Sequence, residues 1–253
     1  MPTPSVIISG GAGSVAAEDI TDAGTTGIEL LQAETGSEAA QIIDRRFNDP
    51  LAGAGAGWTT GSPVGGASAT WSAGKLTLAV PASTAGAVGV YRTSGVIPDG
   101  ASEWDVLLRM DVTSGDNSSS TRVGIHAGKS STDHVSLSMW TSGSIELGRV
   151  IGGSYGGASY GGASGLDSTA RTGGQLWVKL SHRLGRVTAA WAVGSAGAPP
   201  TGWRVERVLT GTDATDVAGG TYVEVWAATT DTSVSAGLTV EVLAIRGRGS
   251  ASL

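Results

Sequence analysis

The sequence predicts an all-β fold, an antiparallel two-sheet sandwich preceded by a short N-terminal arm and a helical segment. Runs of alternating apolar and polar residues recur from Phe47 onward, separated by glycine, serine, aspartate and proline. Glycine accounts for 41 of 253 residues, which favours turns over long helices. Hydrophobic residues make up 40% of the chain, which is enough for one large core.

The alternating runs are the predicted strands. In KLTLAV, for example, Leu76, Leu78 and Val80 share one face, because successive side chains of a strand point to opposite sides. Gly185, in the LGR sequence between two such runs, predicts a tight hairpin. The other predicted strands are EWDVLLRMDV, HVSLSMW, QLWVKLSHR, RVTAAWAV, TYVEVWAATT and GLTVEVLAIRG.

The segment before Phe47 predicts two short helices. Thr26 with Glu29 and Thr35 with Glu38 have the spacing of capping boxes, in which a hydroxyl and a carboxylate satisfy the first backbone amides of a helix. Gly36 interrupts the helical pattern, which favours two short helices over one long one. We therefore expect residues 1–45 to form an arm with short helices, and residues 46–253 to form the sandwich.

Composition excludes several classes of function. The net charge of −6, without a basic cluster, argues against a nucleic-acid partner. The chain has no cysteine, no signal peptide pattern and no apolar run long enough for membrane insertion. We expect synthesis in the cytoplasm and no cofactor.

The histidines and one acidic turn are the residues of the chain that could serve as metal ligands. His126, His134 and His182 are scattered without ligand spacing, so a structural role is expected for them. Asp116 and Asn117, in SGDNSSSTR, have oxygen ligands that suit Ca²⁺, but such residues also make turns. No metal site is predicted, and Ca²⁺ binding stays open.

Three aromatic residues are the candidate binding residues. Tyr155 and Tyr160 lie in the glycine-rich stretch GGSYGGASYGGASG, which predicts a long loop between strands. A tyrosine ring and its hydroxyl suit stacking on a sugar, but the loop could equally be a linker or contact a neighbouring subunit. Trp140 is out of phase with the core residues of its run, so it is expected to face outward. Packing is the expected role of the tryptophans Trp104, Trp177, Trp191, Trp203 and Trp226.

Residues 47–248 resemble the concanavalin A-like (laminin-G and glucanase-like) jelly roll in the order of their features. The resemblance implies a fold that hosts both glycan-binding modules and glycoside hydrolases. Hydrolases of this fold place a carboxylate pair on one strand, whereas Glu224 and Glu241 each stand alone on theirs, so no enzyme is expected. The matching segments are RFNDPLAGAGAGWT, WSAGKLTLAV, EWDVLLRMDV, QLWVKLSHRLGRVTAAWAV, PPTGWRVERV and GLTVEVLAIRG.

The N-terminal segment DITDAGTTGIELLQAETGSEAAQIID resembles a short segment of bacteriophage tail fibres and related virion appendages. Gln41 and the pair Ile42-Ile43 replace the arginine and the Leu-Gly of that pattern. The resemblance implies a homo-oligomer, expected to be a trimer, attached to other virion proteins by its N-terminus. The matching positions are Asp19, Ile20, Thr21, Gly27, Leu30, Leu31, Ala33, Ala39 and Ala40.

Together these observations predict a virion fibre or spike protein that adheres to a host surface polysaccharide. Two alternatives stay open at this stage: a structural decoration of the particle without a ligand, and a glycan depolymerase. The sequence leaves open whether attachment is to the head or the tail.

Overall fold

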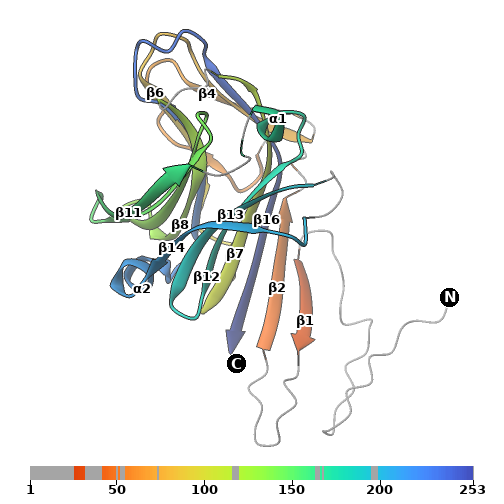
Figure 1. Cartoon of the computed structure of the whole chain (residues 1–253). Helices are drawn as coiled ribbons and strands as arrows, with labels where there is room; N and C mark the ends of the chain where they lie inside the picture. The colour runs from red at the N-terminus through yellow and green to blue at the C-terminus, as the bar shows by residue number, and fades with distance from the viewer. Residues whose placement is uncertain are drawn as a thin grey trace, which may run out of the picture.

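The computed structural model describes residues 26–31, 42–49, 51, 55–72, 74–115, 120–162, 166, 168–194 and 199–252. Within these residues, antiparallel strands form two sheets and two short helices lie at the edges of the sandwich (Figure 1). The predicted all-β sandwich is therefore confirmed.

The first sheet contains nine strands among the described residues. They are β1 (Thr26–Leu31), β2 (Ile42–Asp49), β4 (Ser68–Ser72), β5 (Lys75–Val80), β7 (Glu103–Ser114), β12 (Leu176–Arg183), β13 (Arg186–Val193), β14 (Arg204–Thr210) and β16 (Leu238–Ser252). Their order is β1-β2-β16-β7-β12-β13-β14, with β5 also paired to β16 and β4 paired to β5. Strand β16 thus lies between β2 and β7 and joins the two ends of the chain (Figure 1).

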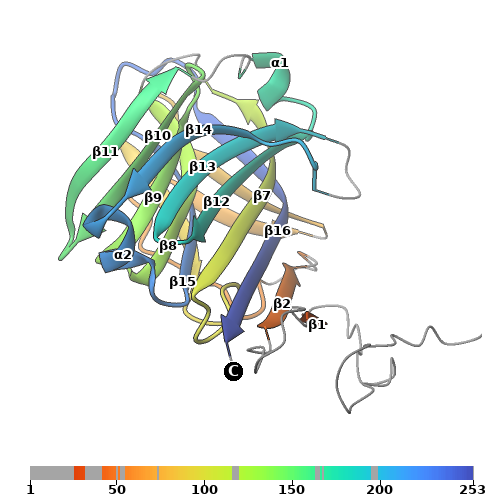
Figure 2. The same cartoon turned by 60° about the horizontal axis from the view of Figure 1, so that its bottom comes forward.

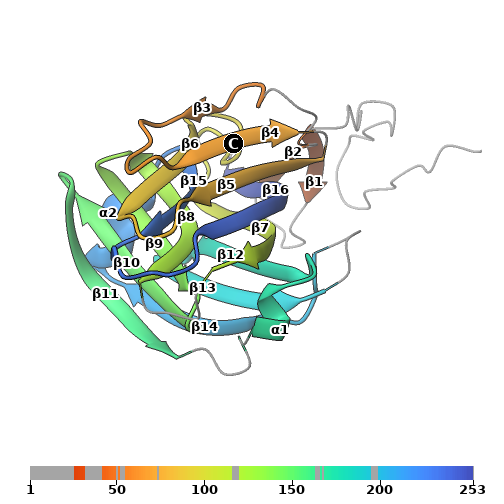
Figure 3. The ribbon, with the colours of Figure 1, turned by 90° about the horizontal axis from the view of Figure 1, so that it is seen from above.

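The second sheet contains seven strands among the described residues. They are β3 (Thr59–Thr60), β6 (Gly86–Arg92), β8 (Thr121–Ser130), β9 (Asp133–Trp140), β10 (Ser144–Ile151), β11 (Ser154–Gly162) and β15 (Tyr222–Thr229). Their order is β11-β10-β9-β8-β15-β6-β3. The two sheets form separate layers, with β12 to β14 lying over β8 to β10 (Figures 2 and 3).

The core lies between the two layers. Trp104, Leu108 and Met110 enter it from β7, and Ile125 and Leu137 enter it from the other sheet; each is at most 1% exposed. Burying one such side chain stabilises the fold by about 1.5–3 kcal/mol. The helices α1 (Ser168–Arg171) and α2 (Thr212–Ala218) are short, and no helix among the described residues has the length and apolar character that a membrane crossing requires.

The predicted N-terminal helices are wrong where the structure describes them. Thr26 and Glu29, the first capping box, lie in strand β1, and Ile42–Asp49 form β2. Backbone pairing of β2 with β16 overrides the local helix signal, as tertiary context often does. The second capping box falls outside the described residues. Strand β2 also crosses residue 45, the expected boundary, whereas the attachment role of residues 1–45 stays a prediction.

The predicted glycine-tyrosine loop is also wrong. Most of it forms strand β11, which pairs with β10 along its length. Gly152 and Gly153 connect the two strands with φ values of 56° and 79°. Two successive positive φ values define the type I′ turn that suits a two-residue hairpin, so the glycines serve the turn.

Candidate functional site

The outward face of the seven-stranded sheet carries aromatic and ionisable side chains. Ile125 of β8 and Val225 of β15 enter the core, so the residues on either side of them point outward. Tyr222 and Trp226 are buried but lie outside the core cluster, as expected for this position. We call this surface the aromatic face. Its residues are Tyr91, Arg122, His126, His134, Trp140, Glu146, Tyr155, Tyr222, Glu224 and Trp226.

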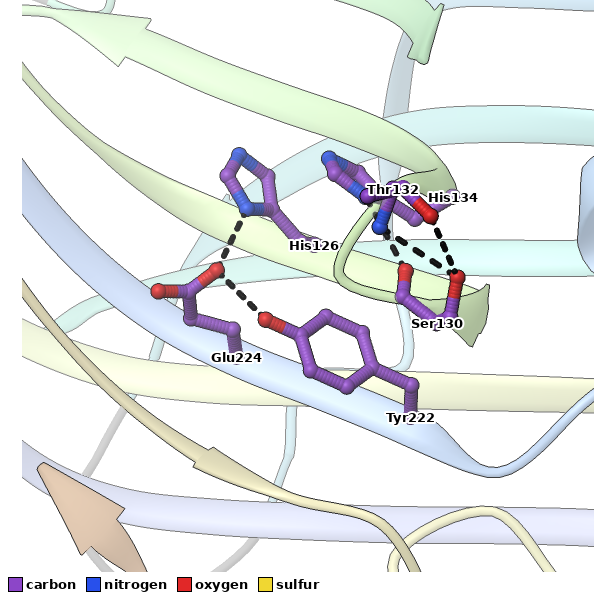
Figure 4. A network of polar contacts seen from close by, with 6 residues as sticks. All are labelled: His126, Ser130, Thr132, His134, Tyr222 and Glu224. Atoms are coloured by element: carbon purple, nitrogen blue, oxygen red, sulfur yellow. Dashed lines mark hydrogen bonds and ion pairs between the residues drawn. The ribbon is translucent and has the colours of Figure 1, made fainter. Parts of the chain in front are cut away.

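A carboxylate at the centre of the aromatic face holds two neighbours (Figure 4). Oε2 of Glu224 lies 2.7 Å from Nδ1 of His126 and accepts a hydrogen bond of 2.8 Å from the hydroxyl of Tyr222. Because an ionised carboxylate only accepts, Nδ1 of His126 is the donor. The pairing of β15 with β8 puts Glu224 directly opposite His126, although the two are 98 residues apart in sequence.

These contacts keep Glu224 ionised. Burial acts to raise the pKa of Glu224, but the hydrogen bond and charge of His126, together with the Tyr222 hydroxyl, lower it below its ordinary value. Both bonds end on Oε2, which leaves Oε1 of Glu224 to accept from a ligand. A side chain at Gly89 would displace this carboxylate, so the glycine leaves room for the position that Glu224 adopts.

His134 is a neutral partner in the same cluster. Its ring stacks on that of His126 with a centroid separation of 4.2 Å, and its Nδ1 lies 3.2 Å from the carbonyl oxygen of Ser130 (Figure 4). Burial and the charge of His126 lower the pKa of His134 to about 4. Near neutral pH it therefore adds an aromatic surface without adding charge.

Arg122 joins two indole rings on the aromatic face. Its guanidinium carbon lies 4.8 Å from the ring centroid of Trp140 and 5.4 Å from that of Trp226. Cation–π contacts of this kind hold the rings and the cation in one arrangement. The ring of Trp226 also lies 5.1 Å from that of His126, which links the indoles to the polar cluster.

Tyr155 lies near the edge of the aromatic face. Its hydroxyl donates a 2.6 Å hydrogen bond to Oε1 of Glu146, and its ring lies on Gly148, where any side chain would collide with it. Burial, with the hydrogen bond and charge of Glu146, raises the pKa of Tyr155. The side chain is nevertheless 51% exposed, so it is both oriented and accessible.

The structure places two of the three sequence-predicted site residues on this face. Trp140 points away from the core, as expected from its phase, and Tyr155 is exposed on β11. Tyr160 is opposite Glu146 in the register of β10 and β11, but its side chain lies outside the described part of the chain. Ligand binding by these residues stays a prediction.

Sequence reasoning missed the polar centre of the face. It assigned His126 a structural role, gave Trp226 a packing role and counted Glu224 only as an isolated carboxylate. The alternation of residues along the strand could have revealed two of them. In TYVEVWA, Glu224 and Trp226 alternate with the core residues Val223 and Val225 and therefore point outward.

No metal site is found among the residues that the structure describes. They include no group of three or more histidine, aspartate or glutamate side chains placed to hold an ion. Asp116 and Asn117, the residues considered for Ca²⁺, lie outside the described residues.

Comparison with known proteins identifies the fold. No family model and no curated protein matches the sequence. The VIP36 exoplasmic/lumenal domain in its Ca²⁺-bound form matches with a TM-score of 0.53 and 13% identity, over 78% of this chain and 87% of that one. Its Ca²⁺/Man2-bound form matches with a TM-score of 0.50 and 12% identity, over 80% of this chain and 86% of that one.

Two further similar structures have names that refer to glycosidases. An endo-1,3-beta-glucanase from Streptomyces sioyaensis has a TM-score of 0.53 and 11% identity, over 82% of this chain and 96% of that one. A mutant of the GH43 protein BlXynB from Bacillus licheniformis has a TM-score of 0.52 and 13% identity, and the match covers 80% of this chain and 39% of that one. The chain therefore has the concanavalin A-like jelly-roll fold expected from its strand order. The expectation that it is no enzyme is corrected, because enzymes are among the proteins that share its fold.

Proposed function

We propose that the aromatic face binds a glycan. The observation that carries the proposal is the placement of an ionised carboxylate with an unused oxygen, on Glu224, among the rings of Trp226, Trp140 and Tyr155. Sugar rings have apolar faces that stack on aromatic side chains and hydroxyls that donate to carboxylates. The Man2-bound form of VIP36, which shares the fold, supports a glycan as the ligand class.

The site would bind each glycan chain weakly. An aromatic pair contributes about 0.5–1.5 kcal/mol beyond its buried area, so a few stacking contacts give modest affinity. Several copies of the chain on one particle would increase the avidity by about 10²–10⁴ without any new contact.

The biological setting that we propose is a virion fibre or spike, with the aromatic face directed at a host surface polysaccharide. The proposal is supported by the resemblance of residues 19–44 to the N-terminal segment of phage fibres. In this setting the N-terminus attaches to other virion proteins, the protein is a trimer, and the jelly roll faces outward. Immunogold labelling of particles with an antibody to the chain would test it, and particles that carry no label would contradict it.

Binding is tested on a glycan array with the full chain and two variants. Tyr155→Ala removes an exposed ring, and Glu224→Gln removes the charge at the centre of the face; both should weaken binding by about tenfold. Val193→Ala, which shortens an exposed apolar side chain at the end of β13 in the other sheet, is the control and should bind like the parent. A folded parent protein that binds no glycan would refute the proposal and favour a purely structural decoration of the particle.

Hydrolysis of the bound glycan is a second candidate, favoured by the similarity to the endo-1,3-beta-glucanase. Glu146 and Glu224 are the carboxylates on the aromatic face, on strands separated by β8 and β9. Incubation with a β-1,3-glucan and measurement of reducing ends tests this candidate. Release that disappears in Glu224→Gln would establish it, and an unchanged polymer would remove this substrate.

A further inference from the structure

The outward face of the nine-stranded sheet carries a second cluster, made of cations. Lys179 of β12 is opposite Leu107 of β7, and Leu107 is opposite Arg246 of β16. Arg109 is two residues further along β7, on the same side of the sheet. Neighbouring strands are about 4.8 Å apart, so the backbones of Lys179 and Arg246, which lie two strands from each other, are separated by about 10 Å. We call Arg109, Lys179 and Arg246 the basic row.

Aromatic rings hold two cations of the basic row in place. The guanidinium carbon of Arg246 lies 5.3 Å from the ring centroid of Trp177, and Nζ of Lys179 lies 4.5 Å from that of Trp203. Trp177 is fully buried but lies outside the core cluster, so it packs beneath the row on the outward side. Cations that are already oriented lose less conformational entropy when they bind a ligand.

Carboxylates on this face are engaged elsewhere. Asp105 accepts a 2.6 Å hydrogen bond from Arg183, and Oδ1 of Asp111 accepts one of 3.1 Å from the backbone N–H of Gly173. Glu241 of β16 forms an ion pair with a lysine of β5. Each of these carboxylates has a partner outside the row, although the charge of Asp105 also acts on Lys179.

Two cations of the row repel one another: burial and then the neighbouring Arg109 lower the pKa of Arg246. Burial also lowers the pKa of Lys179, whereas of the two charges near it Asp105 raises that pKa more than Arg183 lowers it. A bound anion would relieve this repulsion. Crowded, half-buried cations of this kind are more common at binding sites than on inert surfaces.

We propose that the basic row binds oxyanion groups of a sparsely charged anionic glycan. The row presents three cations, which match one or two carboxylate, sulfate or phosphate groups. Duplex DNA carries a charge every ~1.7 Å, and the net charge of −6 on the chain repels so dense a polyanion. Trp177 is fully buried and offers no stacking surface for bases, and the ring of Trp203 already contacts Lys179. The site is on the opposite sheet from the aromatic face and does not depend on its function.

The test measures binding of the full chain to hyaluronan oligosaccharides, which carry one carboxylate per two sugars, and to their methyl esters. Arg246→Gln and Lys179→Gln should each weaken binding of the carboxylate form by about tenfold. Lys129→Gln is the matched control, because it removes the same charge from an exposed position at the end of β8. Thermal melting of each variant shows whether the fold is kept.

Four outcomes would overturn the proposal. The first is equal binding of the methyl esters, which would mean that the carboxylates are not recognised. The second is an equal loss of affinity in Lys129→Gln, which would indicate a general effect of net charge. The third is binding of duplex DNA at the same salt concentration as tightly as hyaluronan, which would assign the row to polyanions in general. Failure of the parent protein to bind any of these probes would also contradict it.

Discussion

Acidification should destabilise the protein through His134. The side chain is 4% exposed, and its pKa in the folded chain is about 4, against an ordinary value of 6.5. Between these two values the unfolded chain binds a proton that the folded chain does not, so the free energy of unfolding decreases as the pH falls. The difference between the folded and unfolded pKa values of His134 corresponds to about 3 kcal/mol of stability, because a tenfold change in proton affinity is worth about 1.4 kcal/mol. At pH 5 the expected loss is about 2 kcal/mol relative to pH 8.

Urea unfolding at pH 8, 6.5 and 5 measures this loss in the parent protein and in His134→Gln. The variant should start from a lower stability but lose about 2 kcal/mol less on acidification to pH 5. His182→Gln is the control: His182 also has a lowered pKa but lies in the other sheet, so this variant should keep the contribution of His134. Glu224 contributes in a different pH range. Its pKa is lowered in the folded chain, so the stability that it contributes is lost only when the pH falls below its ordinary value of 4.5. Parallel pH profiles for the parent and His134→Gln would refute the reasoning.

Three further predictions concern glycan binding, a turn and the core. Gly148→Ala should displace the ring of Tyr155 and weaken glycan binding by about threefold to tenfold on an array; unchanged binding would show that Tyr155 does not contact the ligand. Leu184 is 89% exposed with a φ of 49°, a conformation that asparagine tolerates better, so Leu184→Asn should raise stability by about 0.5–1 kcal/mol in urea unfolding. No increase in the midpoint would count against strain at this turn. Trp104→Ala should cost about 3–5 kcal/mol, because the indole is 1% exposed in the core; a loss below 1 kcal/mol would mean that the core closes over the space.

Alternation of residues was sufficient to predict the sandwich. Leu76, Leu78 and Val80 are buried as their spacing required, and the hairpin at Gly185 is present, with a φ of 68°. These features follow from local rules, because a strand with one buried face must alternate and a two-residue hairpin must contain residues with positive φ.

The errors arose where distant pairing decides the structure. The capping box of Thr26 and Glu29 is a valid local signal, but pairing through β2 to β16 makes the segment a strand. The glycine-rich composition around Tyr155 suggested a loop, whereas β10 provides a partner for strand β11. Neither partner can be read from the segment itself.

The candidate site shows the same limit. The outward phase of Trp140 was visible in one strand, but the contact of His126 with Glu224 depends on the pairing of β8 with β15. A single strand shows which residues point outward, and only the register shows which of them meet. Phase analysis of every strand would have selected Glu224 and Trp226 as candidates without identifying their partners.

The position of β16 has a consequence for biosynthesis. On the ribosome, β2, β5 and β7 are completed long before the strand that joins them, so these three strands of the larger layer must each wait with one backbone edge unsatisfied. Nascent chains in this state are prone to aggregation. A frameshift or premature stop just before Leu238 would therefore abolish folding of the whole sandwich, although most of the hydrophobic core had already been translated.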